Sequence, residues 1–137
     1  MPHFAKAALE QSLRDHDIAY VHMPELGGLR KPRPDSINTG WRNVSFRGYA
    51  DYMQTDEFWA AIDRLRVLGE QRRTAIMCAE AVPWRCHRSL IADALTVRGV
   101  EVRHITSAAE PAPHKLTQFA RVEDGRITYP APLTLGL

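Results

Sequence analysis

The stretch from Cys78 to Ser89 holds the side chains of this sequence that are best suited to chemistry. It brings two thiols, a carboxylate, an imidazole and two guanidinium groups close together along the chain, from Cys78, Glu80, Arg85, Cys86, His87 and Arg88. An apolar, β-compatible run leads into it and an amphipathic helical pattern leads out of it. Turns from a strand to a helix commonly bind anions and substrates in α/β proteins. The sequence therefore places a candidate site at this turn.

The charge pattern at the turn indicates an anionic ligand. Arg85 and Arg88 stand near a helix N-terminus, where the helix dipole is positive and a cation typically costs about 0.3–1 kcal/mol. A bound phosphate or carboxylate would reverse this sign, because backbone N–H groups, the dipole and an arginine fork would all face one negative group. We therefore predict a small anionic ligand, phosphate-bearing or nucleotide-like, in contact with Arg85, Cys86, Arg88 and Ser89.

Three residues are candidates for catalysis: Cys78, Glu80 and His87. Cys78 would end its strand close to the positive end of the next helix, and such surroundings lower a thiol pKa and create a nucleophile. Glu80 would act as acid or base and His87 would assist, in a hydrolase or transferase reaction. Cysteine-based phosphatases place an arginine at the position that Trp84 occupies here, whereas Arg85 follows one residue later, which argues against that class.

Purely structural roles are the alternative for the same residues. The two arginines of the turn would then pair with carboxylates, Glu80 or Glu25, and no ligand would bind. Cys86 would be a small buried hydrophobe, and His87 would lie against the sheet with one hydrogen bond.

A zinc site is a further alternative for the cysteines. Its ligands would be Cys78, Cys86, His87 and a distant histidine, His22 or His104. The spacing of these residues matches none of the common zinc signatures. We therefore predict neither a metal ion nor an organic cofactor.

An earlier segment is expected to complete the site. Residues 18–22 are predicted to form a strand, after which come Glu25 and two glycines. If this strand is a parallel neighbour of the one before Cys78, Glu25 faces the same cleft. The cleft would be covered by Arg47, at the end of a long irregular segment predicted over 29–47, and by Tyr49 just after it. In the alternative interpretation the glycines only form a turn and the charges of the segment are solvated.

The periodicity of the sequence predicts the elements that position these residues. Strand, helix and strand follow one another over 74–78, 90–98 and 100–105, which is typical of a right-handed βαβ unit in a parallel sheet. The predicted fold is α/β: a single three-layer domain over residues 1–137, with a small, mainly parallel sheet flanked by helices and a C-terminal hairpin. Further predicted elements are a helix over 4–16, a helix from the N-cap Thr55 to about Gly69, and a hairpin turn at Asp124-Gly125.

Composition limits the classes of function. The chain has 137 residues, 45% of them hydrophobic and 25% charged, enough for one globular core, and no apolar run approaches the roughly 20 residues of a membrane helix. With no signal-peptide pattern, we expect a cytoplasmic protein without a membrane partner. The net charge of +2 is too small to indicate nucleic acid binding, although a basic, aromatic stretch at 30–48 leaves open a non-catalytic nucleic-acid- or protein-binding module.

Three runs of the sequence resemble the domain of unknown function 488 family: residues 78–80 with 86–89, residues 20–28, and residues 46–53. The resemblance spans residues 2–130 and implies a compact α/β domain without an assigned activity. Members of that family usually begin with an additional strand that ends in an Asp-x-Arg element, which this chain lacks. The resemblance therefore implies an exposed sheet edge that an oligomer would cover, or a truncated, inactive relative.

Overall fold

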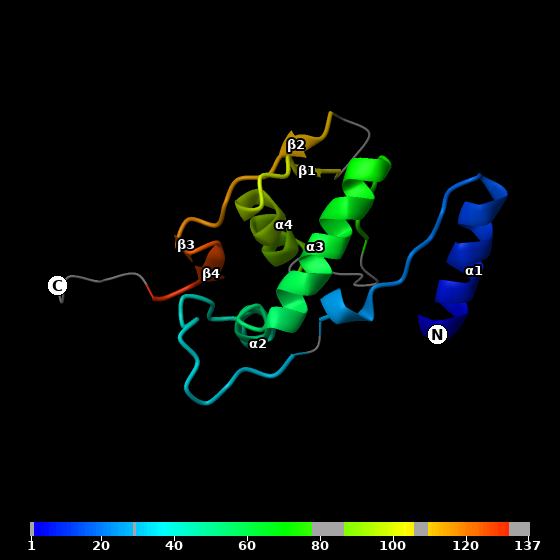
Figure 1. Ribbon diagram of the computed structural model, residues 1–137. Helices are drawn as coiled ribbons and strands as arrows, with labels where there is room; N and C mark the ends of the chain where they lie inside the picture. Colours follow the sequence, from blue (N-terminus) through cyan, green and yellow to red (C-terminus); the bar gives the residue numbers. More distant parts are fainter. Residues whose placement is uncertain (1, 29, 78–86, 106–109, 132–137) are drawn as a thin grey trace.

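The computed structural model describes residues 2–28, 30–77, 87–105 and 110–131. Figure 1 shows helices α2, α3 and α4 gathered into one body, with two short strand pairs beside them. The helices are α1 (Pro2–Asp15), α2 (Val44–Tyr52), α3 (Asp56–Gln71) and α4 (Arg88–Val97), with a short 3-10 helix η1 (Pro24–Leu26). The strands are β1 (Arg103–His104), β2 (Ala112–Pro113), β3 (Arg121–Glu123) and β4 (Arg126–Thr128).

Side-chain caps start two of these helices. The Thr55 hydroxyl accepts a hydrogen bond from the backbone N–H of Phe58 at 3.2 Å, which confirms the predicted start of α3. Asn43 caps α2 in the same way, accepting from the backbone N–H groups of Ser45 at 2.8 Å and Phe46 at 3.2 Å. The prediction of an irregular segment as far as residue 47 was wrong, because this cap begins a helix at Val44.

The core lies between α2, α3, α4 and β4. Its largest fully buried apolar side chains come from all four elements and from the residues that directly follow α2 and β4. Burying each such side chain typically contributes about 1.5–3 kcal/mol. The set consists of Tyr49, Met53, Phe58, Ile62, Leu90, Ile127 and Tyr129.

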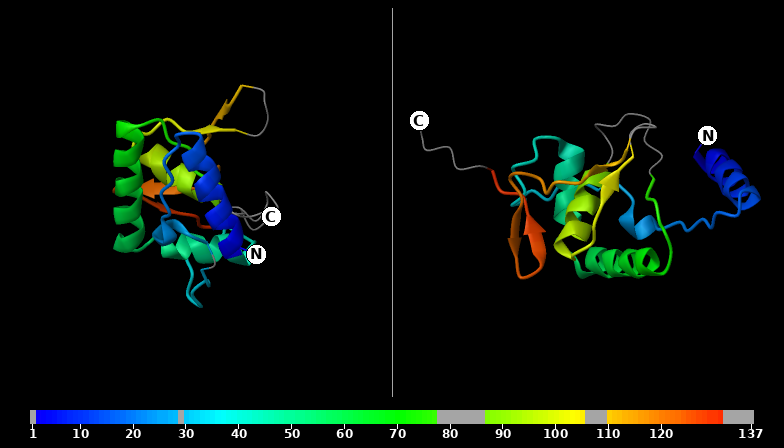
Figure 2. Two further views of the ribbon diagram at one scale, coloured as in Figure 1. Left: turned by 90° about the vertical axis from the view of Figure 1, so that its right-hand side faces the viewer. Right: turned by 90° about the horizontal axis from the view of Figure 1, so that it is seen from above.

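Helix α1 stands apart from this core. Figure 1 and the right-hand view of Figure 2 both show an extended segment leading from α1 to the rest of the molecule. The predicted helix over 4–16 is confirmed as α1. The predicted strand over 18–22 is wrong: these residues have no strand assignment, and Ile18 and Val21 are 53% and 59% exposed. A strand exists only where a neighbour accepts its backbone hydrogen bonds.

The two sheets are small and antiparallel. Strand β1 pairs with β2 in the register Arg103↔Pro113, and β3 pairs with β4 in the register Val122↔Ile127. The turn between β3 and β4 lies at Asp124 and Gly125, with positive φ angles of 50° and 73°, which confirms the predicted hairpin.

The predicted three-layer fold with a mainly parallel sheet is wrong. Residues 74–77 form no strand within the described part of the chain, so α4 does not connect two parallel strands. β1 pairs instead with β2, which follows it closely in sequence. Such a local pairing closes a shorter loop and costs less chain entropy than a crossover connection. The chain does combine helices with strands, as expected.

Candidate functional site

The predicted site centres on the N-terminus of α4, of which residues 87–89 are described. Helix α4 begins at Arg88 after the N-cap His87, whose side chain makes no capping hydrogen bond, and its first turn contains no acidic residue. Arg88 is exposed and Ser89 is half-buried. The other predicted site residues of the turn, Cys78, Glu80, Arg85 and Cys86, lie outside the described residues.

His87 connects this helix start to η1. Its Nε2 atom donates to the backbone carbonyl of Leu26 at 2.8 Å, and its ring centroid lies 4.5 Å from that of Tyr49. A Cβ atom on Gly28 would lie 3.0 Å from Nδ1 of His87. The second glycine of the pair therefore permits this close approach, and the structure brings the two predicted halves of the site together.

Tyr49 lies in the core beneath this contact. It is 1% exposed, and its hydroxyl donates to the same Leu26 carbonyl at 2.8 Å. Burial, together with the neighbouring Tyr52, raises the pKa of Tyr49 far above its ordinary value, so its hydroxyl remains protonated and serves as a donor. The predicted role of Tyr49 in ligand binding remains a prediction.

Glu25 and Arg47 occupy separate places. Glu25 forms an ion pair with Arg64 at 3.0 Å, and its backbone carbonyl accepts the Tyr52 hydroxyl at 2.5 Å. Arg47 lies on α2, where its Nε donates to the Trp41 carbonyl at 3.0 Å. Glu25 is thus adjacent in sequence to the carbonyl that accepts the His87 hydrogen bond, whereas Arg47 donates to a residue of its own segment.

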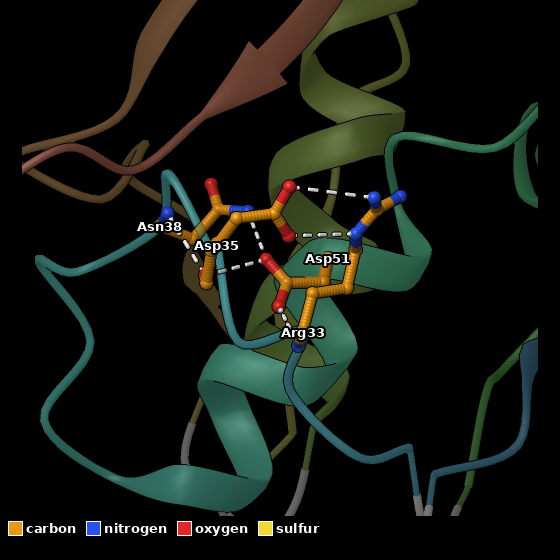
Figure 3. A network of polar contacts seen from close by, with 5 residues as sticks. Arg33, Asp35, Asn38 and Asp51 are labelled. Atoms are coloured by element: carbon orange, nitrogen blue, oxygen red, sulfur yellow. Dashed lines mark hydrogen bonds and ion pairs between the residues drawn. The ribbon is translucent and has the colours of Figure 1, made fainter.

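A buried carboxylate that the sequence analysis missed organises the segment before α2. Asp51 is 6% exposed and accepts three hydrogen bonds, from the backbone N–H of Arg33 at 2.8 Å, the Ser36 hydroxyl at 2.7 Å and the Asn38 amide at 2.7 Å. Figure 3 shows Arg33 and Asn38 converging on it, with Asp35 beside the Arg33 guanidinium. These three hydrogen bonds hold residues 33–38 against α2.

A second missed carboxylate, Asp93, lies on α4 and is fully buried. One oxygen, Oδ1, accepts from His114 Nε2 at 2.7 Å and from the Thr117 backbone N–H at 3.1 Å. The other, Oδ2, accepts from the Tyr129 hydroxyl at 2.8 Å. His114 Nδ1 lies 2.6 Å from Nε2 of His104. The signal was present in the sequence as one acid within the apolar run of residues 90–95.

His104 and Arg88 line a common groove of about 410 Å³ between α3, α4 and β1. Its floor includes the apolar side chains of Leu65, Leu95 and Val102. Partial burial, the neighbouring His114 and the Arg88 charge lower the pKa of His104, while the Asp93 charge acts in the opposite direction. The lowered pKa favours the neutral form of His104 at pH 7.

Comparison with known proteins places the chain in a family. The family model described as Domain of unknown function DUF488 matches residues 1–95. The chain belongs to the DUF488 family. The matched part of this DUF488 chain includes α1 to α3 and most of α4, with His87, Arg88 and Asp93. Neither the curated proteins nor the solved structures gave a match.

The described residues of this DUF488 chain offer two kinds of polar chemistry. The start of α4 presents helix N–H groups, a guanidinium and a hydroxyl, a set suited to an anion. The groove presents a neutral imidazole in contact with a buried carboxylate through a second imidazole. Within the described ranges, no three side chains of the metal-binding types gather closely enough to hold an ion, and no helix there has the length and apolarity to cross a bilayer.

Proposed function

We propose that this DUF488 chain binds a small anionic ligand, phosphate-bearing or nucleotide-like, at the N-terminus of α4, and that the site serves a hydrolase or transferase reaction. The observation that carries the proposal is the composition of this helix start. The side chain of its N-cap residue, His87, makes no capping hydrogen bond, and its first turn contains no acid, yet it carries Arg88 and Ser89. Helix α3 supports the contrast, because it has both a cap and two acids, Asp56 and Glu57.

The energetics of a helix start favour an anion at this place. The first N–H groups of a helix have no acceptor within the helix, and the dipole concentrates positive charge there. In α4 the N–H groups of Leu90 and Ile91 already turn back to the His87 carbonyl, at 3.0 and 3.3 Å. We assign the Arg88 side chain and the backbone N–H and hydroxyl of Ser89 as contacts of the ligand.

The catalytic part of the proposal depends on the segment before His87. Cys78 is proposed as the nucleophile and Glu80 as the acid or base, with Arg85 and Cys86 as further ligand contacts. His87 would hold the turn in place through its bond to Leu26. Glu25 lies next to that bond in sequence and remains the alternative acid or base.

Phosphate-dependent stabilisation tests the binding proposal. Inorganic phosphate, nucleotides and phosphosugars are titrated while the midpoint of thermal unfolding is followed. A ligand at a hundred times its Kd stabilises by about 2.7 kcal/mol, so a clear increase is expected for the native chain and none for Arg88→Ala. Arg121→Ala, which removes an exposed arginine from β3, is the matched control. An equal increase in both variants, or none in the native chain, would contradict the proposal.

Thiol reactivity tests the nucleophile separately. In the Cys86→Ser variant Cys78 is the remaining thiol of the chain, and its alkylation by iodoacetamide at neutral pH should be fast and should be slowed by phosphate. The Cys78→Ser variant gives the corresponding rate for Cys86. A slow reaction at Cys78 that phosphate does not change would remove the nucleophile from the proposal and leave the binding site in place.

A further inference from the structure

A chain of hydrogen bonds runs from the core to the groove beside α4. It begins at Asp93, which is fully buried, passes through His114, whose side chain is 6% exposed, and ends at half-buried His104. The two links measure 2.7 Å and 2.6 Å. Burial thus decreases along the chain of bonds, and its outer end lies at a groove that can admit a small molecule.

The chemistry of the inner end fixes the protons of both imidazoles. An ionised carboxylate only accepts hydrogen bonds, so the Nε2 atom of His114 must carry a proton. In the neutral ring Nδ1 then holds a lone pair and accepts the proton on Nε2 of His104. His104 consequently has its lone pair on Nδ1. Asp93, acting through His114, thus determines which nitrogen of His104 is basic.

Asp93 is held firmly enough to fix the proton positions on both imidazoles. Besides His114 it accepts the Thr117 backbone N–H and the Tyr129 hydroxyl, so both of its oxygens are fixed. Buried networks in which every polar group has a partner are rigid and direct their members into one arrangement. The carboxylate therefore acts as an anchor with one defined orientation.

Charges around His104 complete its environment. Partial burial disfavours its protonated form most, followed by the charges of His114 and Arg88, whereas Asp93 favours it. The remaining charged side chains that line the groove are Arg66, Glu70, Glu101 and Arg103. An imidazole that is neutral at pH 7 and is connected to a carboxylate has the properties of a general base.

We propose that His104 is a general base of the groove, oriented by His114 and Asp93, and that it takes a proton from a hydroxyl group or a water molecule beside an anionic ligand held by Arg88. The ligand class rests on the proposed function, because Arg88 belongs to that anion site. His104 would be the residue that contacts the ligand or the water, and His114 and Asp93 are positioning residues.

The proton transfer balances within these groups. The O–H bond of the hydroxyl group or water breaks, its proton forms a new bond to Nδ1 of His104, and the oxygen keeps the electron pair. The resulting imidazolium donates from Nε2 to His114, whose Nε2–H in turn faces the Asp93 carboxylate. The positive charge is thereby stabilised by a buried negative charge, as in other carboxylate–histidine pairs.

Nitrogen NMR of the histidine rings tests the positioning. We expect His104 and His114 to be protonated on Nε2, and His104 to titrate below an ordinary histidine. In Asp93→Asn, which keeps an oxygen acceptor but removes the charge, the titration of His104 should move to lower pH. Asp56→Asn removes an equal charge from an exposed position and should leave it unchanged. A proton on Nδ1 of His114, or the same titration in Asp93→Asn, would overturn the proposal.

Modification by diethyl pyrocarbonate tests the basic atom, because this reagent attacks unprotonated imidazole. At pH 8, where His104 is neutral in both proteins, mass spectrometry should show modification of His104 that is several-fold slower in Asp93→Asn than in the native chain. Equal rates would overturn the role of Asp93.

Protection by phosphate distinguishes the oriented base at His104 from the proposed anion site at Arg88. Inorganic phosphate should slow the modification of His104 in the native chain but not in Arg88→Ala. If the Asp93→Asn effects are found without protection by phosphate, the oriented base stands and the anion site at Arg88 fails. If phosphate protects while Asp93→Asn changes neither titration nor rate, the anion site stands and the oriented base fails.

Discussion

Asp51 and Asp93 are both buried carboxylates on helices, and each accepts three hydrogen bonds, but their partners differ in kind. Asp51 binds a backbone N–H, a hydroxyl and an amide, none of which gains or loses a proton near neutral pH. Asp93 binds a backbone N–H, a phenol and an imidazole. The first arrangement can only hold the chain in place, whereas the second can also move a proton. The partners of a buried acid, more than its burial, indicate whether it has a chemical role.

Removing Asp51 should give the largest effect on stability. Asp51→Ala leaves the donors of Arg33, Ser36 and Asn38 without their acceptor, and we expect a loss of about 3–5 kcal/mol in the free energy of unfolding. Urea unfolding at pH 7 measures it, with Asp56→Ala as a control expected to lose at most about 1 kcal/mol, because its ion pair with Arg126 is exposed. A loss below about 1 kcal/mol at Asp51 would show that this segment is not fastened by its carboxylate.

Replacing each acid by its amide should distinguish the two sites. At Asp51 the lost oxygen faces the backbone N–H of Arg33, which cannot reverse and would meet an amide N–H group. At Asp93 it faces the Tyr129 hydroxyl, which can turn and accept instead. We therefore expect Asp51→Asn to cost about 1–2 kcal/mol more than Asp93→Asn in urea unfolding. Equal costs would remove the distinction between the two carboxylates.

A fall in pH should lower the free energy of unfolding through the protonation of His104. The folded state holds the pKa of His104 below the ordinary value of 6.5, so the unfolded chain binds the proton more readily. This contribution to stability is fully present above pH 6.5 and is lost as pH falls toward the pKa of the folded state. Unfolding free energies measured in steps from pH 8 to pH 5 should decline less in His104→Gln. The same decline in both proteins would exclude His104 as the cause.

The smallest expected change in the free energy of unfolding comes from a substitution at the start of α4. In phosphate-free buffer Arg88→Ala should raise the free energy of unfolding by a few tenths of a kcal/mol, because it removes a cation from the positive end of a helix dipole. Thermal unfolding at low salt is the appropriate measurement, and high salt should reduce the gain. A destabilised variant would indicate that Arg88 serves the fold, as the residues around Asp51 do.

The sequence predicted features that depend on neighbouring residues. Thr55 with the acids after it marked the start of α3, and Asp124-Gly125 marked the hairpin, since caps and tight turns are decided by a few adjacent residues. Apolar runs such as 74–77 and 100–105 did not indicate which segments they would pair with. Periodicity indicates which face of a strand is buried, but it does not identify the neighbouring strand. The predicted parallel sheet was wrong for this reason.

The candidate site was predictable only in part. Residue types indicated the polar start of α4. Its proximity to Gly28 was expected from two parallel strands that the described residues do not form, and the structure brings the two together through His87 instead. The contact between His104 and His114 depends on the pairing of β1 with β2. The predicted parallel sheet did not contain this pairing, so the contact was not predicted. An acid in the middle of an apolar helix such as α4 requires buried partners, and His114 is one of them here.

Tyr129 has a consequence for how the chain unfolds. Its backbone N–H donates to Asn38 and its hydroxyl donates to Asp93, so a single residue after β4 joins the surroundings of both carboxylates. The two regions should therefore open together as one cooperative unit, with amide hydrogens near Asn38 and near Asp93 exchanging at the same rate. Tyr129 also lies beyond residues 1–95, the part that matches the family model. A fragment that ends at residue 95 would lose this cooperativity and expose the acid of α4.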